Sequence, residues 1–132
     1  MSTSRIKRRS AGPAVALFFL ASFAATAHPQ AAFAVDCAQL DAAASQAGVR
    51  IAGASSGRRV VGKGRLQFYS APDFSCRTPG VFILPGESLD AYVEHRGFVA
   101  VLYINPKTGK DASGWVESAR LRPTGYGIAP AQ

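Results

Sequence analysis

The chain has 132 residues, which suits one small domain and is too short for the large sheets on which many hydrolases are built. Fifteen Lys and Arg residues against eight Asp and Glu residues give it a formal net charge of +7. A surplus of this size raises the question of nucleic-acid binding, whereas two cysteines and two histidines offer little for a metal site.

The first 34 residues have the order of a secretory signal peptide. The basic cluster at its start consists of Arg5, Lys7, Arg8 and Arg9. An apolar and small-residue run follows at residues 11–25, and it ends before the length of about 20 residues that crosses a membrane. Small residues allow cleavage after Ala27 or after Ala34, and we expect the second site to be used.

Removal of residues 1–34 changes the electrostatic interpretation. Four of the fifteen basic residues lie in that segment and none of the eight acidic ones does, so the remaining chain carries a net charge of +3. Most of the positive surplus therefore serves export. We expect a periplasmic or secreted protein with no integral membrane span once the signal is removed.

Cys37 and Cys76 are the only cysteines, and export places them in an oxidising compartment. We therefore expect one disulfide between them, which should stabilise the folded chain by about 4 kcal/mol through the entropy of loop closure. Zinc or another metal is not expected, because only His95 remains as a histidine after cleavage and no Cys-x-x-Cys spacing exists. No cofactor is expected either.

Residues 37–47 are predicted to form a short helix. Asp36 can cap its first turn, with Gln39 three residues on, and an apolar face follows at helical spacing. That face consists of Cys37, Leu40, Ala44 and Ala47. Residues 48–63 are rich in Gly, Ala, Ser and Arg, so we assign residues 35–63 to a short helix and a linker.

Five short strands are predicted after Gly64, which makes the fold mainly β. They cover residues 66–69, 81–84, 88–94, 98–104 and 114–117. In the third strand Leu89, Ala91 and Val93 alternate with polar residues and should share one face. Short strands joined by tight turns favour a small barrel, which buries one core without open edges.

The run at residues 98–104 is apolar at every position, so both of its faces need cover. The N-terminal helix, held by Cys37, could supply that cover, and a partner protein is the alternative; we favour the helix. The last ten residues, 123–132, are rich in Pro, Gly and Ala and are predicted to form a flexible tail.

The segment from Gly64 to Leu121 resembles a bacterial SH3-like domain, and we place the barrel at residues 64–122. The resemblance rests on a short strand with a small-residue and Pro turn, an apolar strand ending in Gly, an aromatic-led strand and a closing Gly-Trp-Val. The corresponding segments are residues 66–72, 82–86, 97–101 and 114–116, with Leu121. Phe98 stands where the family commonly has Trp. The resemblance implies a small barrel and, for many such domains, peptidoglycan binding, but the fold alone does not name a ligand.

Four aromatic residues are the candidate contact residues for a ligand or partner: Tyr69, Tyr92, Phe98 and Trp115. Tyr69 and Tyr92 are predicted to point outward from their strands. For Trp115 we favour packing over ligand stacking, although an indole can bury its ring and still present one edge.

Catalysis is not expected. Residues 53–57 match Gly-x-Ser-x-Gly by letter, but that motif works at a sharp strand-to-helix turn on a large sheet. His95 lies in a turn between two charged residues, and a Cys–His pair fails if both cysteines are bridged.

Three functions follow from these observations. The favoured one is a non-enzymatic module that binds a protein partner in the cell envelope, as an inhibitor or immunity protein does. The first alternative is binding to peptidoglycan. The second is binding of nucleic acid or another anionic polymer through a basic cluster in the linker, which we disfavour because a solvated linker explains the same charges. That cluster consists of Arg58, Arg59, Lys63 and Arg65.

Overall fold

A computed structural model describes Gly12 and residues 33–128 of the chain. The predicted signal peptide at residues 1–34 lies almost wholly outside the described residues, which include only Gly12, Phe33 and Ala34 of it. No helix in the described part of the chain is long and apolar enough to span a membrane.

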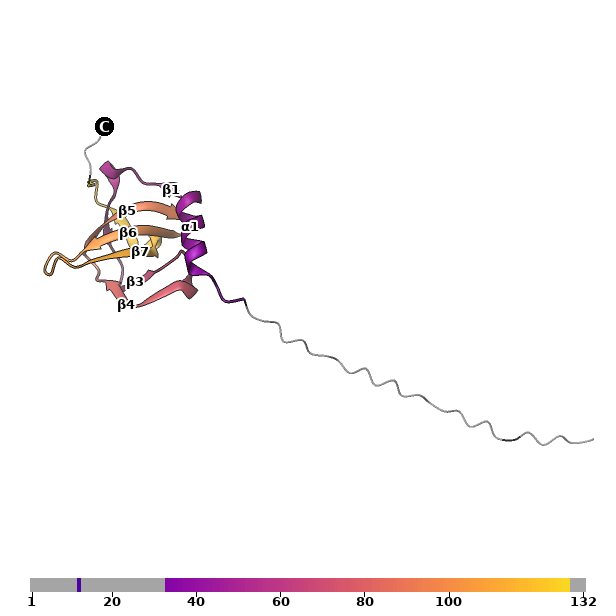
Figure 1. The fold of residues 1–132 in the computed structure, drawn as a ribbon. Coiled ribbons are helices and arrows are strands. Elements are labelled where there is room, and N and C mark those ends of the chain that lie inside the picture. Colours follow the sequence, from indigo (N-terminus) through magenta and orange to yellow (C-terminus); the bar gives the residue numbers. More distant parts are fainter. Residues whose placement is uncertain (1–11, 13–32, 129–132) are drawn as a thin grey trace, which may run out of the picture. The chain divides into compact units, whose positions relative to one another are not determined.

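The described residues form a mainly β fold with one α-helix, drawn in Figure 1. In chain order the α-helix and strands are α1 (Cys37–Ala47), β1 (Val49–Arg50), β2 (Gly57–Val60), β3 (Leu66–Tyr69), β4 (Arg77–Ile83), β5 (Ser88–His95), β6 (Phe98–Ile104), β7 (Asp111–Glu117) and β8 (Leu121–Pro123). One antiparallel sheet has the order β4-β3-β7-β6-β5-β2-β8, with β1 paired to β5. The sheet curls into half a barrel, and α1 runs across one end of β5, β6 and β7 (Figure 1).

Helix α1 begins where the sequence predicts. The Asp36 carboxylate accepts hydrogen bonds from the main-chain N–H groups of Ala38 and Gln39, each at 3.1 Å, which caps the first turn. The helix ends at Gly48, where the backbone becomes extended, and no larger residue fits at this position. A Cβ at position 48 would collide with the side chain of Val93 and lie 2.8 Å from the carbonyl oxygen of Ala44.

All five predicted strands are present, but the predicted linker is wrong for part of residues 48–63. β2 lies within that segment and pairs with both β5 and β8. Its backbone groups are satisfied by the two neighbouring strands, and Val60 is 1% exposed, opposite Leu121. β2 therefore belongs to the sheet, and the sheet begins before Gly64.

The predicted flexible tail is also wrong for residues 123–128. The N–H of Gly57 donates to the carbonyl of Tyr126 at 2.8 Å, and the N–H of Thr124 donates to the carbonyl of Gly57 at 3.1 Å. The N–H of Ile128 donates at 3.2 Å to the hydroxyl of Ser56, which is buried. These bonds hold the C-terminal segment against β2; residues 129–132 lie outside the described residues.

The sheet carries apolar side chains on both faces. The main cluster fills the inside of the curl and consists of Val60, Leu66, Phe68, Ile83, Leu89, Ala91, Val99, Val101, Tyr103, Val116 and Leu121. A second cluster lies on the outer face beneath α1 and consists of Ala44, Tyr69, Val93, Phe98 and Trp115. β6 contributes to both: its inner face is covered along the strand, whereas its outer face is covered only at Phe98 and Ala100.

Val93 is not on the face that alternation predicts. Ala91 pairs with Val101 and Val93 pairs with Ala100, so Tyr92 is an extra residue in β5. Such a bulge shifts the alternation by one position. Leu89 and Ala91 therefore point into the main cluster, whereas Val93 packs on the outer face beneath α1.

The predicted disulfide between Cys37 and Cys76 is confirmed, with the two Cα atoms 5.7 Å apart. It joins the first residue of α1 to the short 3-10 helix Phe74–Cys76 that immediately precedes β4. Only Ala44 of α1 is buried, so the helix has little apolar surface of its own with which to hold the sheet. The bond supplies a second attachment at the N-terminal end.

The burial of the Tyr103 hydroxyl in the core can be tested by titrating the phenol. Its hydroxyl donates to Glu87 at 2.8 Å, and burial, followed by that carboxylate, raises the pKa of Tyr103 to about 12. Because this pKa is higher in the folded than in the unfolded chain, the neutral phenol favours folding. That contribution is complete below about pH 10 and is lost as the pH rises through about 12. We expect the absorbance of tyrosinate to show a late step that Tyr103→Phe removes and Glu87→Gln shifts to lower pH.

Candidate functional site

The outer face of β5, β6 and β7 is only partly covered by α1, and two open hollows lie on it. The first, here called the helix-side hollow, has a volume of about 570 Å³ and lies between Asp41 of α1 and Leu102. The second, the tail-side hollow, has a volume of about 660 Å³ and lies between Leu102 and the C-terminal segment 123–128. Leu102 lines both, so the two hollows meet at this residue.

The register of the strands explains why Leu102 is uncovered. On the outer face it lies opposite Asp90 of β5 and Ser113 of β7, which are both short polar residues. Closer to α1, Ala100 lies opposite Trp115, and the indole fills the space beneath the helix. Beyond Leu102 the next outer residue, Ile104, is 57% exposed. The helix therefore covers the Phe98 end of β6 and leaves the Ile104 end open.

Three of the four predicted contact residues are buried. Trp115, Phe98 and Tyr69 are 1%, 6% and 7% exposed, and all three belong to the cluster beneath α1. Tyr69 does lie on the outer face, but the prediction that it reaches solvent is wrong. Its ring meets those of Phe74 and Phe98 edge-on, with centroids 5.7 and 5.4 Å away. Burial, and then the charge of Glu117, raise the pKa of Tyr69.

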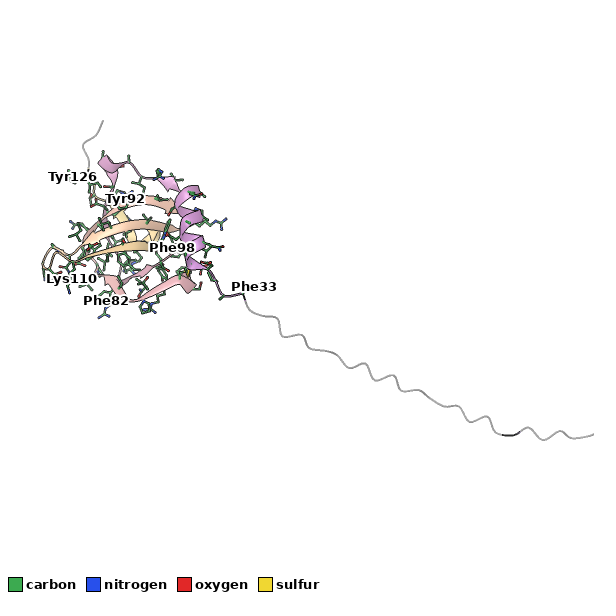
Figure 2. The ribbon with its side chains drawn as sticks, in the orientation of Figure 1. Phe33, Phe82, Tyr92, Phe98, Lys110 and Tyr126 are labelled. Atoms are coloured by element: carbon green, nitrogen blue, oxygen red, sulfur yellow. A yellow bond between two sulfur atoms is a disulfide. The ribbon has the colours of Figure 1, made fainter. Side chains whose placement is uncertain are left out.

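Tyr92 is the one predicted contact residue at the surface, with 37% of its area exposed. Figure 2 shows it beside β5, apart from Phe98, which lies close to α1. The bulge in β5 places Tyr92 at the edge of the helix-side hollow. Tyr92 therefore lines the same hollow as Leu102 and the buried Trp115, whereas Tyr69 and Phe98 do not line it.

Trp115 joins the sheet to the helix. Its indole Nε1 donates to Oδ1 of Asp41 at 2.7 Å, so the polar edge of the ring is satisfied by α1. The only tryptophan in the chain therefore holds the helix in place. This contact also fixes the wall of the helix-side hollow, since both residues line it.

The tail-side hollow combines apolar and charged residues. Its apolar side consists of Leu102 and Ile104 of β6. Its charged side consists of Arg59 of β2, Asp90 of β5 and Arg122 of β8. Asp90 accepts a hydrogen bond from Ser56 at 3.0 Å. The hollow can hold an extended chain or a side chain with both apolar and charged groups.

Sequence reasoning missed Leu102, Ile104 and Arg122, and it named Arg59 only as part of a basic cluster in a linker. The apolar run at residues 98–104 was the available signal for the first two, because every second residue of that run must lie on the outer face. Arg59 was assigned to a linker, so nothing indicated that it sits opposite Arg122 in a sheet.

Comparison of the chain with protein-family models, with curated proteins and with solved structures finds no match in any of the three. Within residues 33–128 no group of three or more His, Cys, Asp or Glu side chains is placed to hold a metal ion. The geometry of the outer face is therefore the basis for a functional proposal.

Proposed function

We propose that the chain is a non-enzymatic, exported binding module with an SH3-like barrel, and that its outer sheet face binds a protein partner in the cell envelope. The observation that carries the proposal is the open half of β6. Leu102 is half-buried and Ile104 is exposed, and they are continuous with Tyr92 across two hollows. Apolar and aromatic residues at the centre of a hollow, with polar residues around them, are typical of protein interfaces.

The disulfide supports the exported setting, because bonds of this kind persist in oxidising compartments. It also supports the role of a rigid platform. The cross-link and the contact between Trp115 and Asp41 fix α1 at one border of the face, and the hydrogen-bonded segment 123–128 forms the other.

A protein partner is favoured over peptidoglycan because three of the four aromatic residues predicted for contact are buried. Sugar binding commonly needs flat ring faces at the surface, whereas the rings of Tyr69, Phe98 and Trp115 are packed beneath α1. Nucleic acid is disfavoured because two of the four residues of the basic cluster are engaged in local contacts. Arg58 donates to the carbonyl of Ser55 at 2.6 Å, and the guanidinium of Arg65 lies 4.1 Å from the ring centre of Phe82.

Leu102→Arg is expected to weaken the complex with the partner by about tenfold or more, because it places a charge at the centre of the apolar face. The exported protein is used to capture its partner from envelope extract, the partner is identified by mass, and the purified pair is measured by calorimetry. Val49→Arg is the matched control, since Val49 is 73% exposed on β1.

The two variants should unfold at the same denaturant concentration as the parent chain. A stoichiometric complex that Leu102→Arg weakens and Val49→Arg leaves intact would support the proposal. Retention on purified sacculi with no protein complex would instead assign the chain to the cell wall. Equal binding by all three proteins would remove the outer face from consideration.

A further inference from the structure

Two arginines lie directly opposite each other at the tail-side hollow. Arg59 of β2 pairs in register with Arg122 of β8, and both side chains are exposed and line the hollow. On its other side Arg59 lies opposite Ser88 of β5. Neither cross-strand neighbour of Arg59 is therefore acidic.

Like charges placed directly opposite on neighbouring strands destabilise a sheet. Asp90 lines the same hollow, and one of its carboxylate oxygens already accepts the hydroxyl hydrogen bond of Ser56. Arg122 donates from Nη1 to the carbonyl of Leu121, at 2.9 Å, which leaves other N–H groups of its guanidinium for a further acceptor. A pair of this kind is suited to a carboxylate, which can accept hydrogen bonds from two guanidinium groups at once.

The apolar part of the hollow lies next to this pair. Leu102 lies opposite Asp90 in register, and Ile104 is the next outer residue of β6. A ligand that spans the hollow from β6 to the arginines therefore meets the apolar side chains of β6 first and then passes over β5. This requires an apolar group and a carboxylate on the same short segment.

We propose that the tail-side hollow recognises an extended segment of the protein partner in which an Asp or Glu lies next to a bulky apolar residue. The carboxylate binds between Arg59 and Arg122, and the apolar side chain packs on Leu102 and Ile104. The inference rests on the proposed function and adds the chemistry of the partner. A polyanion such as nucleic acid suits the site less well, since the apolar side chains of Leu102 and Ile104 border the same arginines.

The test is a selection of random linear peptides displayed on phage, using the exported protein with its disulfide formed. We expect enrichment of peptides in which an acidic residue adjoins a bulky apolar one. The affinity of a selected synthetic peptide should fall on the order of fivefold for each of Arg59→Gln and Arg122→Gln. The double variant should no longer select acidic residues but should still select apolar ones.

Lys107→Gln with Lys110→Gln is the matched control. This control also removes two positive charges, but from the loop of the β6–β7 hairpin, where Figure 2 labels Lys110. Neither lysine lines the hollow. An equal loss of affinity in this control would mean that net charge alone attracts the peptide, and would overturn the inference. Self-association of the chain would also overturn the inference if the Arg59 and Arg122 variants abolished it. The occupant of the hollow would then be a second copy of the chain.

The same variants have a second readout that a structural role would not give. Because the arginines repel each other, Arg59→Gln and Arg122→Gln should unfold at a temperature no lower than the parent chain while they bind the peptide less well. Selection of apolar peptides with no acidic preference would overturn the inference and leave the proposed function standing. Failure to select any peptide also overturns it, and the proposed function is then decided separately by the Leu102→Arg complex.

Discussion

Replacing both Cys37 and Cys76 with Ser is expected to lower the free energy of unfolding by about 4 kcal/mol. The two residues are 39 positions apart, and releasing a loop of that length gives the unfolded chain this much additional conformational entropy. For a small domain whose total stability is about 5–15 kcal/mol, the loss is large. Urea unfolding of the parent and the double variant, in oxidising buffer, measures it.

The loss should be accompanied by release of α1, because the helix buries only Ala44 and is too short to be stable alone. Trp115 is the single tryptophan and lies beneath that helix, so its fluorescence should shift to longer wavelength and a hydrophobic dye should bind. Reductant added to the parent chain should reproduce both effects and should leave the double variant unchanged. Equal stability of the oxidised parent and the variant would show that the cross-link is not what holds the helix.

The elements that the sequence predicts are those with a strong local signal. Residues 66–69 and 88–94 alternate, residues 98–104 are apolar throughout, and Asp36 with Gly48 marks the ends of α1. β2 has no such signal, since its sequence is Gly-Arg-Arg-Val. It is a strand because it lies between β5 and β8, and a pairing with residues so distant in the chain leaves no local pattern.

The candidate site was predicted less well than the fold, and for a related reason. Aromatic residues are the usual choice for a contact surface, but the position of α1 decides which of them reach solvent. The helix buries Trp115 and Phe98, and it stops short of Leu102. The bulge at Tyr92 is equally invisible in the sequence, because alternation through residues 88–94 is unbroken by residue type. Both effects depend on tertiary contacts.

The uncovered outer end of β6 lowers the stability of the isolated chain and provides the surface for the proposed binding. Burying Leu102 and Ile104 would remove more apolar area from water and would stabilise the isolated chain. Helix α1 instead crosses only one end of the strands, so it covers β6 at Phe98 and Ala100 and leaves the other end open. The disulfide stabilises the rest of the fold, so the domain tolerates the exposure of Leu102 and Ile104. An exposed apolar surface on a rigid domain is what the proposed docking surface requires.

Trp115→Ala is expected to lower the free energy of unfolding by about 3–5 kcal/mol, the usual cost of removing a fully buried large aromatic side chain. The indole is 1% exposed and packs with Tyr69, Val93 and Phe98 beneath α1. Its loss leaves a cavity that the helix cannot fill, because the disulfide fixes the N-terminal end of α1. Urea unfolding monitored by far-ultraviolet circular dichroism measures the change without relying on tryptophan fluorescence.

Part of that cost belongs to the hydrogen bond between the indole Nε1 and Asp41. Asp41→Ala should cost about 1–3 kcal/mol, because it leaves a buried N–H without its acceptor. Trp115→Phe removes the donor and keeps an aromatic ring, and adding Asp41→Ala to it should cost clearly less than Asp41→Ala costs alone. The difference is the coupling between sheet and helix, which a double-mutant cycle isolates. Strictly additive losses would mean that Trp115 stabilises the chain by packing alone and that α1 is held by the disulfide and Ala44.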